Sequence, residues 1–206
     1  MAIWLVRHGE TEWSISGRHT GSTDIPLTPD GRLQATAIGK LLAGRRFDHV
    51  FASPMLRARE TAGLAGFGDR MRLHEGLLEY DYGELEGLTT GQIRAIHPGW
   101  QLFRDGCPGG EMPEQMAKRV DALIEELREL GDNSLLFGHG HCLRSLAVRF
   151  LDLPIRYATN LLLGTGTISI ASDGRDEPAL ALWNRRVDPR AMIVADIAAA
   201  IARTAP

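Results

Sequence analysis

Four side chains of this 206-residue sequence could together bind and transfer a phosphoryl group: Arg7, His8, Arg57 and His139. Guanidinium groups match phosphate oxygens bidentately and stay charged at every relevant pH. A neutral imidazole in line with phosphorus could act as the nucleophile and form a phosphohistidine, because phosphoryl transfer depends mainly on positioning and charge stabilisation. These residue types indicate a site for a phosphate dianion, provided that the fold brings them together.

The departing oxygen of a phosphomonoester also needs a proton. A carboxylic acid can supply it when burial or an incoming anion favours the protonated form. The stretch LLEYDYGELEG contains three candidates, Glu79, Glu84 and Glu86. The residue types alone do not choose among the three.

Each candidate for phosphate binding follows an apolar run that predicts a β-strand. The run 3–6 leads into Arg7 and His8, the run 47–53 precedes Arg57, and the run 134–137 precedes His139. Short apolar runs of this kind are typical of strands buried on both faces of a parallel sheet. Ligands bind in the crevice beyond the carboxyl ends of such strands, so we expect all four side chains there.

Helical patterns separate these strands. Thr28 as N-cap, Pro29 after it and Gly44 as a stop predict the first helix, and the helices expected in all cover residues 28–44, 53–66, 111–130 and 138–151. The alternation predicts a three-layer α/β/α sandwich, with a mostly parallel sheet and helices on both faces. We expect one domain over residues 1–206.

The C-terminal part of the sequence departs from this alternation. GTISIAS and ALALWN flank the turn-forming DGRDEP and predict a hairpin or an edge pairing. The alanine-rich segment after Asp188 and Pro189 predicts a helix, which would dock on the body of the protein or cover the site.

Charge and composition exclude several classes of partner. The chain carries 23 basic and 26 acidic side chains, a net charge of -3, so no overall field attracts nucleic acid or anionic lipid. Its two cysteines are too few for a disulfide framework and lack the paired spacing of a structural zinc site. No apolar run reaches the ~20 residues of a membrane span, and the N-terminal run is too short for a signal peptide. We expect a cytoplasmic protein with no nucleic-acid or membrane partner.

Other patterns in the sequence are weaker indications of metal, nucleotide or anion binding. The pair His139 and His141 has the spacing of two metal ligands, but no third ligand follows at a useful distance, and we expect no metal. No nucleotide-binding motif stands in its required context, and we expect no cofactor. The remaining histidines are expected to face solvent: His19, His49, His74 and His97. Five arginines could meet a second phosphate or a carboxylate, or be surface charge: Arg104, Arg144, Arg156, Arg185 and Arg186.

The segment LVRHGETEW resembles the signature of the histidine phosphatase superfamily, also called phosphoglycerate mutase-like. The resemblance continues in the family's order through GRHTGSTDIPLTPDGRLQA, SPMLRARETA, LLEYDYGELEG and GHGHCLR, as far as about Asn184. It implies that His8 is the phosphorylated nucleophile and Glu79 the proton donor. It also implies that the phosphoryl group is bound by Arg7, Arg57 and His139.

The same resemblance implies a set of substrate-site residues: Ser14, Thr20, Gly21, Tyr82 and Gly140. Ser14 stands where many relatives have Asn, which shortens its reach to the phosphate. His141 and Asp81 also depart from the pattern of the mutases in this family.

Within the superfamily, EYDYGELEGLT, LFRDGCPGGE and GHGHCLRSLAVRFLDLP are most similar to the branch of small-molecule phosphatases, which includes sedoheptulose-bisphosphatase-like and sugar-phosphate phosphatase members. This implies metal-independent hydrolysis of a small phosphomonoester such as a sugar phosphate. One alternative is cofactor-dependent phosphoglycerate mutase-type transfer, whose usual Arg-His pair is replaced here by Tyr80 and Asp81. The other is a non-catalytic binder of a phosphorylated metabolite. The oligomeric state, a homodimer included, stays open.

Overall fold

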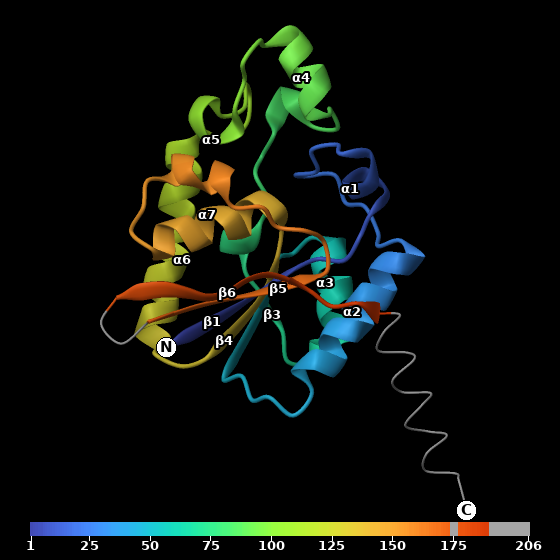
Figure 1. The fold of residues 1–206 in the computed structure, drawn as a ribbon, viewed down its shortest axis with the longest axis vertical. Helices are drawn as coiled ribbons and strands as arrows, with labels where there is room; N and C mark the ends of the chain where they lie inside the picture. The colour runs from blue at the N-terminus through green and yellow to red at the C-terminus, as the bar shows by residue number, and fades with distance from the viewer. Residues whose placement is uncertain (174–176, 190–206) are drawn as a thin grey trace, which may run out of the picture.

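The computed structural model describes residues 1–173 and 177–189 (Figure 1). Within them the centre of the fold is a six-stranded sheet in the order β3-β2-β4-β1-β5-β6. The strands are β1 (Ala2–Arg7), β2 (His49–Ala52), β3 (Arg72–Leu73), β4 (Ser134–Gly138), β5 (Thr167–Asp173) and β6 (Pro178–Arg186). β1, β2, β3 and β4 pair in parallel, whereas β5 pairs antiparallel with both β1 and β6. The predicted C-terminal hairpin is therefore confirmed.

Four of the helices correspond to the predicted ones. They are α2 (Pro29–Leu42), α3 (Leu56–Ala62), α6 (Pro113–Leu130) and α7 (Gly140–Phe150). Three short helices were not predicted: α1 (Glu12–Ser16), α4 (Thr90–Ile96) and α5 (Leu102–Asp105). A π-helical turn (Gly63–Phe67) continues α3, and three 3-10 helices cover Glu75–Leu77, Gly83–Leu85 and η4 (Ile155–Asn160).

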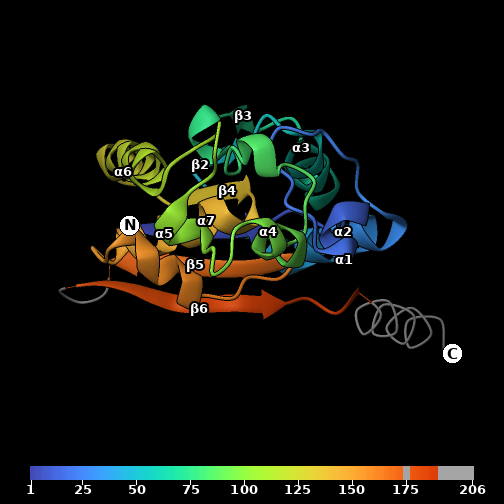
Figure 2. The same cartoon turned by 90° about the horizontal axis from the view of Figure 1, so that it is seen from above.

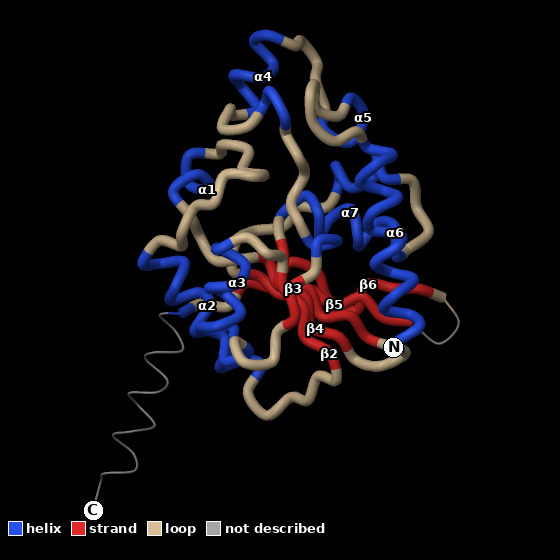
Figure 3. The backbone as a smooth tube through the Cα atoms, turned by 180° about the vertical axis from the view of Figure 1, so that it is seen from behind, coloured by secondary structure: helices blue, strands red, loops and turns tan. Residues whose placement is uncertain are grey.

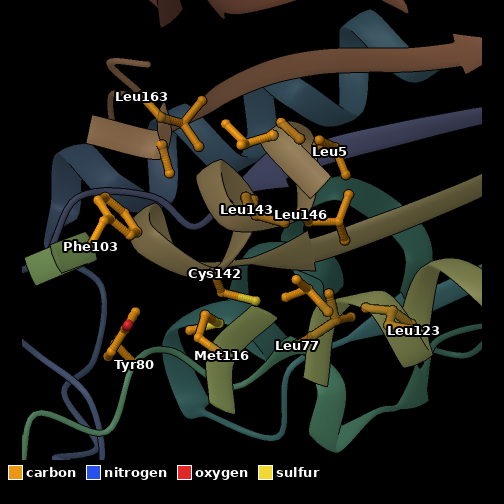
Figure 4. Close-up of a cluster of buried hydrophobic side chains, with 14 of the residues drawn as sticks. Leu5, Leu77, Tyr80, Phe103, Met116, Leu123, Cys142, Leu143, Leu146 and Leu163 are labelled. Atoms are coloured by element: carbon orange, nitrogen blue, oxygen red, sulfur yellow. The ribbon is translucent and has the colours of Figure 1, made fainter. Parts of the chain in front are cut away.

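The sheet lies between two helical layers, with α6 and α7 on one face and α2 and α3 on the other (Figure 3). Neighbouring residues of a strand point to opposite faces, so Leu5 of β1 packs into one core and Val6 into the other. Figure 4 shows the first core, where Leu5 lies with Leu123 of α6 and Leu146 of α7. A strand covered on both faces needs apolar residues at successive positions, which explains the continuous apolar runs. The α/β/α sandwich is confirmed.

The three short helices gather beyond one end of the sheet (Figure 1). Seen from above, α4 and α5 lie over α7 and the sheet (Figure 2). The segments that follow β1 and β4 enter this region, so the short helices surround the crevice at the carboxyl ends of those strands.

None of the described helices is long and apolar enough to cross a membrane. The helix expected after Asp188 and Pro189, with its suggested role as a cover, falls in residues 190–206, outside the described residues.

Candidate active site

The fold brings together the four side chains expected to meet a phosphate. Arg7 ends β1 and His8 follows it, while His139 caps α7 directly after β4. β1 and β4 are parallel neighbours with Arg7 opposite Gly138, and the His8 backbone N–H donates to the Gly138 carbonyl at 3.0 Å. The ring centroids of His8 and His139 are 5.2 Å apart. Adjacent strand ends thus place the two imidazoles side by side, as the sequence predicts.

His8 is held in the protonation state of a nucleophile. Its Nδ1 lies 2.7 Å from the carbonyl oxygen of Gly9, which can only accept, so Nδ1 carries the proton and donates. Nε2 then keeps a free lone pair. Burial, followed by the charges of Arg57 and Arg7, lowers the pKa of His8 well below its usual range. The ring is therefore neutral near pH 7.

Arg57, His139 and Ser53 form the buried floor of the site. Arg57 Nε donates to His139 Nδ1 at 3.0 Å, so the His139 proton is on Nε2, which donates to Ser53 Oγ at 2.7 Å. Burial and the charge of Arg57 lower the pKa of His139 well below its usual range, which keeps this ring neutral. The other Arg57 nitrogens donate to the carbonyl oxygens of Thr20, Gly21 and Thr23.

Nearly all the polar groups of the buried floor are therefore hydrogen-bonded within the protein. Both ring nitrogens of His139 are engaged, and Arg57 and His139 are both 0% exposed. In this structure Arg57 acts on the site through its charge, which reaches His8.

Arg7, in contrast, is incompletely bonded. Its Nη1 donates to the carbonyl of Leu163, but its buried Nε has no hydrogen-bond partner among the described residues. A Cβ on Gly140 would stand 3.2 Å from the Arg7 guanidinium carbon, so glycine there lets the guanidinium lie against the start of α7. An unpaired buried donor costs about 1–3 kcal/mol. The terminal Nη2 of Arg7 also makes no hydrogen bond among the described residues, and Arg7 lines the pocket, so a bound oxyanion could accept from this nitrogen.

Glu79 is the acid candidate that the geometry selects. Its Oε1 accepts from the backbone N–H groups of Tyr80 at 3.0 Å and Cys142 at 2.8 Å, and its Oε2 accepts from that of His141 at 3.0 Å. Of the three glutamates, Glu79 alone lines the pocket that holds His8. Glu86 instead accepts from the backbone of Gly21 and Thr23. Oε1 has two partners and Oε2 one, so Oε2 is the atom free to hold a proton.

The pocket in front of His8 has an empty volume of about 450 Å³. Its lining is Arg7, His8, Thr11, Ser14, Arg18, His19, Thr20, Glu79, Tyr82, Gly140, His141, Arg144 and Leu163. It includes Ser14, Thr20, Tyr82 and Gly140 of the expected substrate residues. Gly21 lies behind the pocket, where its carbonyl accepts from Arg57. The Ser14 hydroxyl is bonded to the backbone of Thr11 as part of the α1 cap.

The model of the histidine phosphatase superfamily (branch 1) matches residues 3–186. The chain belongs to this superfamily. It is 42% identical over 175 residues to an acid phosphatase of Mycobacterium tuberculosis, which covers 82% of this chain and 84% of that protein. It is 33% identical over 184 residues to sedoheptulose 1,7-bisphosphatase of Saccharomyces cerevisiae, covering 74% of this chain and 68% of that protein.

The solved structure of the product of a Mycobacterium tuberculosis open reading frame has the same fold. It superposes with a TM-score of 0.87 at 37% identity, and the match covers 91% of this chain and 98% of the other.

Several residues that line the pocket of this histidine phosphatase were not predicted from the sequence to be there. His19 was expected to face solvent, and that prediction is wrong. His19 is 8% exposed, and its ring packs 4.8 Å from that of Tyr82 and 5.5 Å from that of Trp100. Burial lowers the pKa of His19 to about 4. His97 is exposed, and His49 and His74 are half-buried.

His141 is the second unforeseen imidazole of this histidine phosphatase. Its Nδ1 lies 2.5 Å from the hydroxyl of Tyr82 and 3.9 Å from Glu79 Oε2. Burial and the charge of Arg144 lower the pKa of His141 well below its usual range. Its place two residues after the α7 cap was the available signal, because the first turn of a helix that follows a parallel strand borders the crevice.

The described residues contain no cluster of three His, Cys, Asp or Glu side chains that could hold a metal. The suggested pair of His139 and His141 is divided between two environments. His139 belongs to the buried floor, and His141 lies against Tyr82 in the pocket wall.

Proposed function

We propose that this histidine phosphatase hydrolyses small phosphomonoesters, sugar phosphates among them, through a phosphohistidine on His8. The carrying observation is the state of His8: its Nδ1–H is held by Gly9, and its Nε2 makes no hydrogen bond within the described residues, in a pocket that Arg7 also lines.

In the first step the phosphoryl dianion binds between Arg7 and the Nε2 of His8. Nε2 attacks phosphorus, the P–N bond forms and the ester P–O bond breaks. The proton on Glu79 Oε2 passes to the departing oxygen, which leaves as a neutral alcohol. The Nδ1–H bond to Gly9 stabilises the positive charge that the ring gains.

In the second step water enters in place of the alcohol. Glu79, now a carboxylate, accepts one proton from the water as its oxygen attacks phosphorus. The P–N bond breaks and its electrons return to Nε2, so inorganic phosphate and the original His8 and Glu79 are recovered. Arg7 and Arg57 supply the positive charge for both steps, and we propose that turnover needs no metal ion.

We also propose that the protein works in the cytoplasm. The support is that Cys107 and Cys142 are both free thiols buried in the described structure.

An assay with an aryl phosphate in the presence of a chelator tests this function. The wild-type protein should release phosphate, and His8→Ala should lower kcat by at least about 10⁴-fold because it removes the nucleophile. The matched control is His97→Ala, which removes an exposed imidazole and should keep full activity. Thermal unfolding checks that both variants fold. Full turnover in His8→Ala would refute the proposal.

A further inference from the structure

Arg144 is the one arginine among the five left open by the sequence that lines the pocket holding His8. Arg104 pairs with Asp105 at 2.7 Å, and Arg156 is exposed over the ring of Tyr157. Arg185 and Arg186 belong to β6, away from this lining. Of these five arginines, Arg144 therefore lies in the pocket, and the other four lie at the surface.

Contacts from two other elements hold Arg144 in place. Its Nε donates to the Ala158 carbonyl of η4 at 2.9 Å, and its guanidinium carbon lies 4.9 Å from the ring centroid of Phe103 in α5. Phe103 belongs to the buried core (Figure 4) and is 5% exposed, so this support is rigid. The terminal nitrogens Nη1 and Nη2 make no hydrogen bond within the described residues. The side chain is held in one orientation, and its two terminal nitrogens remain available for bidentate binding of an anion.

No carboxylate is paired directly with Arg144 among the described residues, and Glu79 acts on its charge only from a distance. Burial lowers the pKa of Arg144 to about 10, a net shift that Glu79 and Tyr82 oppose and the charge of Arg7 assists. The side chain therefore stays cationic at pH 7. The pocket is lined by three arginines, Arg7, Arg18 and Arg144, against the single carboxylate of Glu79.

Arg144 lies on the side of the pocket that the leaving group must occupy. The Phe103 ring, which supports the Arg144 guanidinium at 4.9 Å, lies 5.5 Å from the ring of His141. His141 contacts Tyr82 and lies 3.9 Å from Glu79, the group that protonates the departing oxygen. A substrate with its phosphorus at His8 and its ester oxygen at Glu79 therefore extends its alcohol portion toward Arg144.

We propose that Arg144 binds a second anionic group on the alcohol portion of the substrate, so that the preferred substrates are phosphomonoesters carrying a carboxylate or a second phosphate. The inference rests on the proposed function of the same pocket. Arg144 is then a specificity-determining residue, because a substrate with a neutral alcohol portion leaves the terminal nitrogens of Arg144 without an anionic partner.

Two matched pairs of substrates test the proposal. In 3-phosphoglycerate a carboxylate replaces the terminal hydroxymethyl group of glycerol 3-phosphate, and fructose 1,6-bisphosphate adds a phosphate to fructose 6-phosphate. The measured quantity is the ratio of kcat/KM for the anionic over the neutral member of each pair. Arg144→Gln should lower this ratio about 10- to 100-fold, the range of a charge-assisted hydrogen bond. Arg156→Gln removes the same charge outside the pocket and should leave the ratio at its wild-type value.

The two pairs distinguish the two anions. A fall confined to the fructose pair identifies a second phosphate, and a fall confined to the glycerol pair identifies a carboxylate. A wild-type ratio in Arg144→Gln for both pairs overturns the proposal. Arg144→Lys keeps the charge without the planar fork and should retain part of the selectivity, so it decides the matter if Arg144→Gln does not fold.

A binding measurement separates this inference from the proposed function. Calorimetry on His8→Ala protein, with and without Arg144→Gln, gives the Kd ratio of glycerol 3-phosphate to 3-phosphoglycerate, and of fructose 6-phosphate to fructose 1,6-bisphosphate, without turnover. If the wild type released no phosphate from any ester, the proposed function would fail. The Kd ratios would still show whether Arg144 binds a second anionic group of the ligand.

Discussion

The buried floor (Ser53, Arg57 and His139) and the pocket arginines (Arg7, Arg18 and Arg144) use the same charged chemistry in opposite ways. In the floor, Arg57 donates to one ring nitrogen and three carbonyl groups, and His139 engages both its nitrogens. Among the pocket arginines, Arg7 keeps a buried N–H and Arg144 two terminal nitrogens that find no partner in the part of the chain that the structure describes. The floor is complete without a ligand, and the pocket arginines are not.

This difference indicates that the buried floor stabilises the fold, whereas the pocket arginines bind the substrate. A fully bonded buried cation stabilises the fold and fixes the field at His8, because breaking its contacts would leave buried groups unpaired. A partly bonded cation gains its missing partners only when an anion arrives, so its energy goes into binding. Substitutions in the two regions should therefore separate stability from activity.

Arg7→Met should give a large loss of activity with little loss of stability. Kinetics on an aryl phosphate should show kcat/KM lower by about 10³-fold, since the variant removes a donor to the phosphoryl oxygens. The free energy of unfolding, measured in urea, should fall by only about 1–2 kcal/mol, because the variant loses one hydrogen bond, to the Leu163 carbonyl, and also removes an unpaired N–H. A large loss of stability would place Arg7 with the floor.

Arg57→Met should instead destabilise the fold. The variant leaves His139 Nδ1 and three carbonyl groups without their donor, so the free energy of unfolding should fall by at least about 3 kcal/mol. Urea unfolding at pH 7 measures this. The comparison between the two regions breaks down if Arg57→Met is as stable as Arg7→Met.

Glu79→Gln should distinguish proton donation from structural support. The amide oxygen can still accept from the backbone of α7, but the side chain cannot protonate the departing oxygen. The loss of kcat should be about 10²-fold greater for an alkyl phosphate than for a nitrophenyl phosphate, whose leaving group needs no proton. Equal losses for both esters would assign Glu79 a purely structural role.

His19 should make the stability of the pocket wall depend on pH. Its pKa is lowered by burial from 6.5 to about 4, so the unfolded chain binds its proton at a higher pH than the folded protein does. The stabilisation is present above pH 6.5 and is lost as the pH falls toward 4. At pH 5 the loss is about 2 kcal/mol, and urea unfolding of His19→Gln should show a shallower dependence in this window. Identical profiles for the variant and the wild type would contradict the burial argument.

The sequence predicts that His8, Arg57 and His139 lie at one edge of the sheet, because each follows a strand, but only the structure shows that β2, β4 and β1 are neighbours. Continuous apolar runs identify strands buried on both faces, and parallel strands end at one edge. The chemical state of each side chain is decided by contacts between distant segments, which no local pattern records. Burial of His19 depends on Tyr82 and Trp100.

The same limit applies to the pocket mouth. The orientation of Arg144 depends on α5 and η4, and α5 is only one turn long. Helices this short have little intrinsic stability and form through tertiary packing, so their residues carry a weak signal. Ser14 matched the family position by alignment of motifs, yet its hydroxyl caps α1.

The central claim is that His8 becomes phosphorylated during turnover. Rapid quenching of the protein with an aryl phosphate at neutral pH, followed by proteolysis under alkaline conditions and mass spectrometry, locates the phosphoryl group. We expect one acid-labile phosphoryl group, on the imidazole of His8, in the wild-type protein and none in His8→Ala. A phosphoryl group on another residue, or turnover without any phosphoenzyme, would contradict this claim.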